Sequence, residues 1–81
     1  MMLFLCDKKR HLICHPYSIE NLHIMANQLK IKRCWFHRDH YDIPKRRIKE
    51  IEQQCIVVSS RDIVLIKSGK KTTFFHKRGA V

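Results

Sequence analysis

Residues 1–30, which read MMLFLCDKKRHLICHPYSIENLHIMANQLK, contain the pattern that decides the fold. Two apolar runs, 1–6 and 11–15, flank the charged residues 7–10, which predicts two short strands joined by a hairpin turn. Ser18 then stands where a helix N-cap is expected. Behind it, apolar residues recur at intervals of three and four, namely Ile19, Leu22, Ala26 and Leu29. Such a helix needs a sheet to cover.

Further strands and helices are predicted along the rest of the chain. Residues 32–37 contain a compact apolar run with basic flanks and predict a third strand, in which Trp35 belongs to the core. Residues 45–54 predict a second helix, and residues 56–58 a short buried strand. Ser59 with Asp62 has capping-box spacing and predicts a third helix. The order β-β-α-β-α-β-α indicates one small mixed-sheet α/β domain over residues 1–69, followed by a basic C-terminal arm or edge strand over residues 70–81.

Length and composition fit a single soluble domain. The chain has 81 residues, and no apolar run approaches the roughly 20 residues of a membrane span. Residues 1–6 are too short for a signal-peptide core, so we expect a cytoplasmic protein. The four cysteines lie in or beside apolar runs, which favours buried, reduced thiols. Zinc bound by Cys6, His11, Cys14 and His15 is the alternative, but the CxxC spacing is missing; we therefore expect no metal and no cofactor.

The charge balance gives the clearest functional indication. Seventeen Lys and Arg face seven Asp and Glu, a formal net charge of +10, and such a surface attracts polyanions. We therefore expect a small RNA- or DNA-binding accessory protein, of the kind that phages encode. Docking on an acidic face of a host nuclease or nucleic-acid-handling defence complex is the alternative. The candidate binding residues are Lys8, Lys9, Arg10, Arg38, Tyr41, Lys45, Arg46, Arg47, Lys70, Lys71, Lys77 and Arg78.

Residues 37–44, HRDHYDIP, hold the most unusual run of polar groups. His40 and Asp42 alternate, so both point to one face of an extended segment, where they could act with His11 and Asp7. That set would suit a metal-dependent phosphodiester hydrolase or metal-free acid–base chemistry. The simpler interpretation is structural: Asp42 caps the following helix, His40 bonds a carbonyl and Tyr41 covers the core. P-loop, GxSxG and HExxH motifs are missing, so an enzyme is the less favoured interpretation.

The order of short motifs resembles a known family. An apolar strand ends at an acidic residue, Asp7, and is followed by the strings His11-Leu12-Ile13, Leu22-His23-Ile24-Met25-Ala26, Trp35-Phe36 and His40-Tyr41-Asp42-Ile43. This order resembles domain of unknown function 4031, a small domain of bacteria and phages. The resemblance implies a fold but no activity. The family's second acidic residue beside Asp7 and its acidic residue at the next strand's end are replaced by Lys8 and His15, which argues against a divalent-cation site.

Overall fold

The computed structural model describes residues 2–69, which form one mixed sheet flanked by helices. The sheet has the strand order β3-β4-β2-β1-β5. The principal elements are β1 (Leu3–Cys6), β2 (His11–His15), α1 (Ile19–Leu29), β3 (Phe36–His37), β4 (His40–Asp42), α2 (Ile48–Gln54), β5 (Ile56–Val57) and α3 (Ser60–Lys67). Two short 3₁₀ turns complete the set, η1 (Arg33–Trp35) and η2 (Lys45–Arg47).

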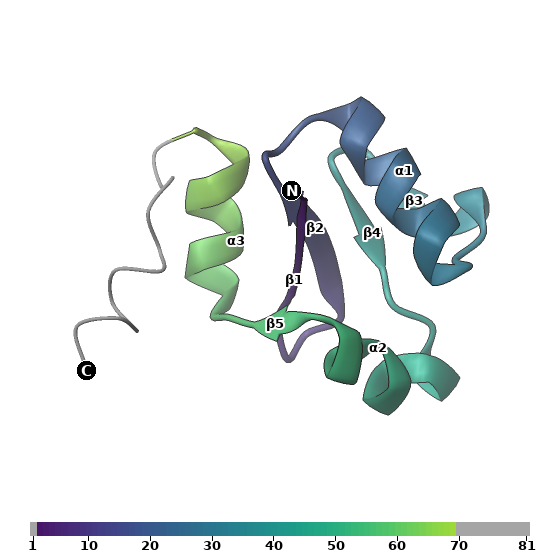
Figure 1. The fold of residues 1–81 in the computed structure, drawn as a ribbon. Coiled ribbons are helices and arrows are strands. Elements are labelled where there is room, and N and C mark those ends of the chain that lie inside the picture. Colours follow the sequence, from purple (N-terminus) through teal and green to yellow (C-terminus); the bar gives the residue numbers. More distant parts are fainter. Residues whose placement is uncertain (1, 70–81) are drawn as a thin grey trace.

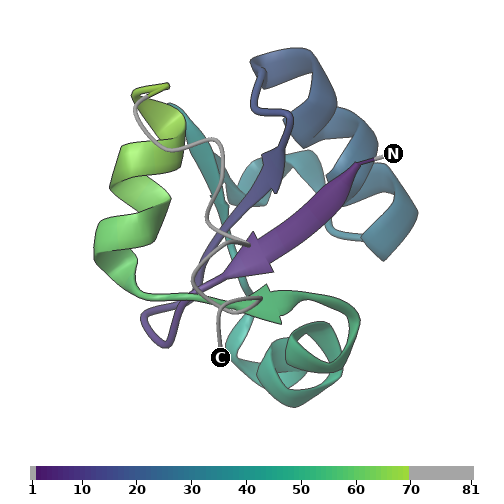
Figure 2. The same ribbon diagram turned by 60° about the vertical axis from the view of Figure 1, so that its left-hand side comes forward.

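The predicted hairpin lies at the centre of the sheet. β1 pairs antiparallel with β2, and β2 pairs antiparallel with β4. β5 returns parallel to β1 on its other edge, and Figure 2 shows it alongside β1 with α2 next to it. α1 and α3 lie on opposite sides of the sheet (Figure 1). The central strand β2 contacts both helices, so it presents alternate side chains to α1 and to α3.

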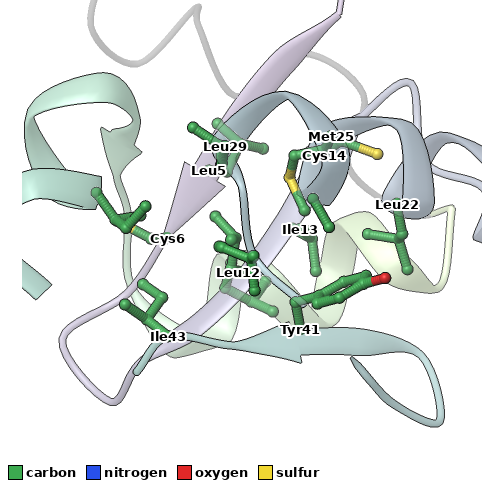
Figure 3. Close-up of a cluster of buried hydrophobic side chains, with 14 of the residues drawn as sticks. Leu5, Cys6, Leu12, Ile13, Cys14, Leu22, Met25, Leu29, Tyr41 and Ile43 are labelled. Carbon is green, nitrogen blue, oxygen red and sulfur yellow. The ribbon is translucent and has the colours of Figure 1, made fainter. Parts of the chain in front are cut away.

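Apolar side chains from the strands and from both flanking helices form the core. Leu12 from β2 and Leu22 and Met25 from α1 belong to this core, and all three are fully buried (Figure 3). On the other side, Ile63 and Ile66 of α3 are buried with the same core. The predicted helical stripe is confirmed in Leu22, Ala26 and Leu29, whereas Ile19 at the helix start is largely exposed.

Both predicted N-caps are confirmed. The Ser18 hydroxyl accepts a hydrogen bond from the backbone N–H of Asn21 at 3.0 Å, and α1 begins at the next residue. The Ser59 hydroxyl accepts from the backbone N–H of Asp62 at 3.1 Å, at the start of α3. Serine is suited to both positions because its side-chain oxygen satisfies a backbone donor that the first helical turn leaves unpaired.

The small mixed-sheet α/β fold is confirmed, with differences in the middle of the chain. Residues 33–35 form a 3₁₀ turn, so the predicted third strand is reduced to Phe36–His37. Trp35 was expected in the core, but it is 36% exposed. β4 was not predicted. Its middle residue, Tyr41, points into the core, and the polar side chains on either side of it, His40 and Asp42, point to the opposite face of the sheet. The predicted C-terminal arm or edge strand, 70–81, lies outside the described residues.

The cysteines and the hydropathy give two further results. Cys6 and Cys14 are buried thiols as expected, Cys55 is half-buried, and Cys34 is exposed because it lies in the 3₁₀ turn. Burial raises the pKa of the Cys14 thiol, which keeps it protonated at neutral pH. Among residues 2–69, no helix is long and apolar enough to cross a membrane.

Candidate functional site

A buried carboxylate, Asp7, organises the turn between β1 and β2. Its Oδ1 accepts hydrogen bonds from the backbone N–H groups of Lys9 and His11, both at 2.9 Å. Its Oδ2 accepts from the Ser60 hydroxyl and from His11 Nδ1, both at 2.7 Å. An aspartate suits this position because a short acceptor side chain can satisfy the backbone donors of a tight turn.

Asp7 is held ionised by these contacts. Burial alone would raise the pKa of its carboxyl, but the hydrogen bonds from Ser60, His11 and the backbone N–H groups outweigh burial and lower the pKa below the ordinary value. A carboxylate can only accept, so His11 Nδ1 carries the proton in its contact with Asp7. The other ring nitrogen of His11, Nε2, is therefore left as the basic atom when the ring is neutral.

His40 lies beside His11 and is held by two other carboxylates. Its Nδ1 is 2.9 Å from Asp39 Oδ1, and its Nε2 is 3.2 Å from Asp42 Oδ1. Asp39 is also bonded by the Lys67 ammonium of α3 at 3.2 Å. The hydrogen bonds from His40 and from Lys67 together lower the pKa of Asp39. The imidazolium form of His40 satisfies both ring contacts, because both carboxylates only accept.

Strand register brings the two histidines together. His11 lies opposite Asp42 in the β2–β4 ladder, and His40 is two residues before Asp42, so it is the diagonal neighbour of His11 on the same face. The ring centroids of the two histidines are 5.0 Å apart in an edge-to-face arrangement. The four residues that the sequence singled out for acid–base chemistry, Asp7, His11, His40 and Asp42, therefore form one cluster on the α3 side of the sheet.

The structure corrects two predicted roles, that Asp42 caps the following helix and that His40 bonds a carbonyl. η2 has Pro44 at its N-cap position with no side-chain cap bond, so Asp42 does not cap it. Within residues 2–69, the ring nitrogens of His40 bond the carboxylates of Asp39 and Asp42 and not a carbonyl. Sequence reasoning missed the parts that Ser60, Asp39 and Lys67 take in the cluster. Asp39 could have been found from its position next to His40 in the sequence. Ser60 and Lys67 could not, because they reach the cluster only through the packing of α3 against strands far away in the chain.

The cluster differs from the familiar hydrolytic arrangements. Ser60 donates to the Asp7 carboxylate and not to a histidine, so it does not form the serine–histidine pair of a catalytic triad. Within residues 2–69, no group of three or more His, Cys, Asp or Glu side chains is arranged to hold a metal ion. The chemistry that this geometry can perform with its own groups is proton transfer by His11 and His40.

Tyr41 points away from the cluster, to the α1 side of the sheet. Its side chain is 1% exposed, and its hydroxyl is 2.7 Å from His23 Nδ1. The ring covers the core as expected, but it is not available to stack on a nucleobase or to anchor a partner, which corrects its inclusion among the binding residues. Tyr41 and His23 line an open hollow of about 500 Å³ beside α1, on the opposite face from the histidine cluster.

Two basic segments meet at one end of the sheet. The backbone N–H of Ile43 donates to the Arg10 carbonyl at 2.9 Å, and the Arg10 guanidinium donates to the Ile43 carbonyl at 3.4 Å. These bonds place the β1–β2 turn against the segment that leads into η2. We call the resulting surface the basic end; it consists of Lys8, Lys9, Arg10, Lys45 and Arg46. Four of these side chains are exposed, and Arg10 is half-buried.

The basic end and the histidine cluster are contiguous. Asp7 and His11 flank the basic turn directly, and Asp42 immediately precedes Ile43. Lys8 is 3.4 Å from Glu52 of α2 but is 75% exposed, so this surface pair leaves its charge largely unscreened by the protein. The other candidates lie elsewhere: Arg38 is exposed at the β3–β4 turn, and Lys70, Lys71, Lys77 and Arg78 lie outside the described residues.

Arg47 is not free to bind a partner. Its guanidinium donates to the carbonyls of Leu29 and Lys30, both at 2.8 Å, and forms a double contact with Glu50. These bonds satisfy carbonyls that the C-terminus of α1 leaves unpaired and tie α1 to α2.

We expect Arg47→Ala to lower the free energy of unfolding by about 1–2 kcal/mol, because it removes charge-assisted hydrogen bonds to two helix-end carbonyls. Chemical denaturation of the variant measures this. The matched control is Arg46→Ala, the exposed neighbour, for which we expect a change within about 0.5 kcal/mol. Equal stability of the two variants would contradict the tying role.

Comparison with protein families shows which family the chain belongs to. Residues 4–69 match the family described as Protein of unknown function (DUF4031). The match spans most of the chain and confirms the resemblance seen in the motifs, so the protein belongs to this family. No curated protein and no solved structure matches it.

Proposed function

We propose that the protein binds nucleic acid through the basic end, as a small accessory protein of the cytoplasm. The observation that carries this is the juxtaposition of Lys8, Lys9 and Arg10 with Lys45 and Arg46 through the backbone bonds between Arg10 and Ile43. Phosphate groups spaced along a strand are neutralised by such a group of cations, and the release of condensed counterions drives association.

The overall charge supports the same proposal. A formal net charge of +10 on 81 residues raises the local concentration of any polyanion at the surface. Exposed lysines supply point charges, while arginine makes bidentate contacts with phosphate oxygens. RNA and DNA share this phosphate chemistry, so the binding experiment includes both.

The salt dependence of binding tests the proposal. We measure fluorescence anisotropy with single-stranded RNA, single-stranded DNA and duplex DNA at two salt concentrations. We expect log K to fall linearly with log salt for the preferred nucleic acid. Replacing Lys9, Lys45 and Arg46 together by Ala should weaken binding and reduce the magnitude of the slope by about 2–3, since each of the three lost phosphate contacts contributes roughly 0.7–0.9 to the slope.

The matched control removes three exposed charges that lie outside the basic end: Lys32, Arg33 and Arg38 replaced by Ala. We expect this variant to keep most of the slope. Equal weakening by both triple variants would show that the basic end is not the binding surface. Failure of the wild-type protein to bind all three nucleic acids at low salt would remove the proposal.

Docking on an acidic protein surface is the outcome that competes with this one. Affinity purification from an expressing cell, with and without complete nuclease digestion, separates the two. Partners that disappear on digestion support a nucleic-acid tether. A partner retained after digestion, together with no binding to the purified nucleic acids, would overturn nucleic-acid binding in favour of protein docking.

A further inference from the structure

We propose that His11 and His40 cleave single-stranded RNA by general base and general acid catalysis, with the ribose 2′-hydroxyl as the nucleophile. This inference rests on the proposed function, because the basic end must first bring a strand beside the histidines. It names the substrate as RNA and the products as a 2′,3′-cyclic phosphate and a free 5′-hydroxyl.

His11 has the geometry of the general base. Its Nδ1 donates to Asp7, whose side chain is 0% exposed, and this bond fixes both the ring orientation and the tautomer. The side chain of His11 is 36% exposed, so the opposite nitrogen, Nε2, can be reached from outside. Among residues 2–69, no side chain or backbone group bonds this nitrogen.

His40 has the geometry of the general acid. Both of its ring nitrogens face carboxylate oxygens, an arrangement that the doubly protonated ring satisfies. The contact with Asp42 is the longer of the two, at 3.2 Å, and the Asp42 side chain is 41% exposed. The His40 side chain itself is 12% exposed, so a substrate oxygen reaches Nε2 by taking the place of Asp42 while Asp39 still holds Nδ1.

The reaction balances with these two groups alone. His11 Nε2 takes the proton from the 2′-hydroxyl, and the 2′-oxygen forms a bond to the adjacent phosphorus. The bond from phosphorus to the 5′-oxygen of the next nucleotide breaks, and His40 gives its proton to that oxygen. One proton is taken and one is given, and no oxidant, reductant or further reactant enters.

The charges around the cluster favour a phosphodiester despite three aspartates. Asp7 is buried under four hydrogen bonds, Asp39 is paired with Lys67, and Asp42 is paired with His40. His37 also faces His40, with ring centroids 5.4 Å apart. The basic turn leads directly into His11. Its three cations, of which Lys8 forms an exposed surface pair with Glu52, lie next to the base and outnumber the one carboxylate that a substrate must displace.

The experiment uses the full chain and a fluorescent single-stranded RNA oligonucleotide in the presence of a chelator. We expect cleavage that leaves cyclic phosphate ends, and no cleavage of an oligonucleotide whose 2′-hydroxyls are replaced by hydrogen. The variants His11→Asn and His40→Asn keep an amide donor in place of Nδ1 and remove Nε2, so the bonds to Asp7 and Asp39 can persist. Each should lower the cleavage rate by about 10²–10⁴-fold.

A modified substrate distinguishes the two roles. With sulfur in place of the bridging 5′-oxygen, the leaving group needs no proton, so the substrate should restore cleavage by His40→Asn but not by His11→Asn. The control His23→Gln removes a histidine from the opposite face and should leave the rate unchanged.

Binding measured with the 2′-deoxy oligonucleotide separates the two proposals. Wild-type protein that binds RNA tightly but does not cleave it would overturn this inference and leave the proposed function standing. Absence of binding to any nucleic acid would overturn both. Cleavage that His11→Asn and His40→Asn leave unchanged would also overturn the inference.

Discussion

Replacing Asp7 by alanine is expected to lower the free energy of unfolding by about 3 kcal/mol at neutral pH. The carboxylate accepts four hydrogen bonds, and its removal leaves the buried donors of the β1–β2 turn without an acceptor. Bonds to a charged group contribute roughly 1.5–3 kcal/mol each, although they are not additive. Urea denaturation measures the change. Ser60→Ala removes a single donor and should lower stability by about 1 kcal/mol.

The effect of Asp7 should depend on pH in a defined direction. The hydrogen bonds lower the pKa of Asp7 in the folded state, so the unfolded chain binds a proton at a higher pH than the native one. The stabilisation is therefore fully present above about pH 4, the ordinary aspartate pKa, and is lost as the pH falls through the folded value. The stability difference between wild type and Asp7→Ala should shrink in acid; a difference that stays constant would contradict this account.

Leu12→Ala, a truncation in the core, should lower the free energy of unfolding by about 3–4 kcal/mol. Leu12 is fully buried on the central strand between α1 and the sheet, so its truncation leaves a cavity that the neighbouring strands cannot close. A domain of this size is stable by roughly 4–12 kcal/mol, so the variant approaches the limit of folding.

The control for Leu12→Ala is Val64→Ala on α3, which removes apolar atoms from a side chain that is 57% exposed. We expect a change within about 0.5 kcal/mol, measured by the same thermal or chemical denaturation. Similar losses for both variants would show that the core is not centred on β2.

Local patterns were sufficient to predict the hairpin and the three helices. The two serine caps, the alternation of charge and apolar runs, and the helical stripe after Ser18 all act within a few residues. β4 escaped prediction because only Tyr41 of its three residues is apolar, and a strand that short has no period to recognise. Trp35 was misplaced because a single apolar run cannot distinguish a strand from a 3₁₀ turn.

The candidate site was predicted in its residue types more than in its contacts. Alternation identified His40 and Asp42 as sharing a face, and this followed from strand geometry alone. Their position beside His11 depends on the β2–β4 register, which the sequence did not determine. The bond from Ser60 to Asp7 spans 53 positions of the chain, and no local pattern carries such information.

That bond and the neighbouring β1–β5 pairing have a consequence for synthesis on the ribosome. Within the described domain, β1 is synthesised before its parallel partner β5 and before Ser60, whose hydroxyl completes the Asp7 hydrogen bonds. Until β5 and Ser60 have been synthesised, the Asp7 turn lacks the Ser60 donor and one edge of β1 is unpaired. The domain therefore completes its folding only after residue 60 has left the exit tunnel, and until then the nascent chain exposes a strand edge that chaperones can recognise.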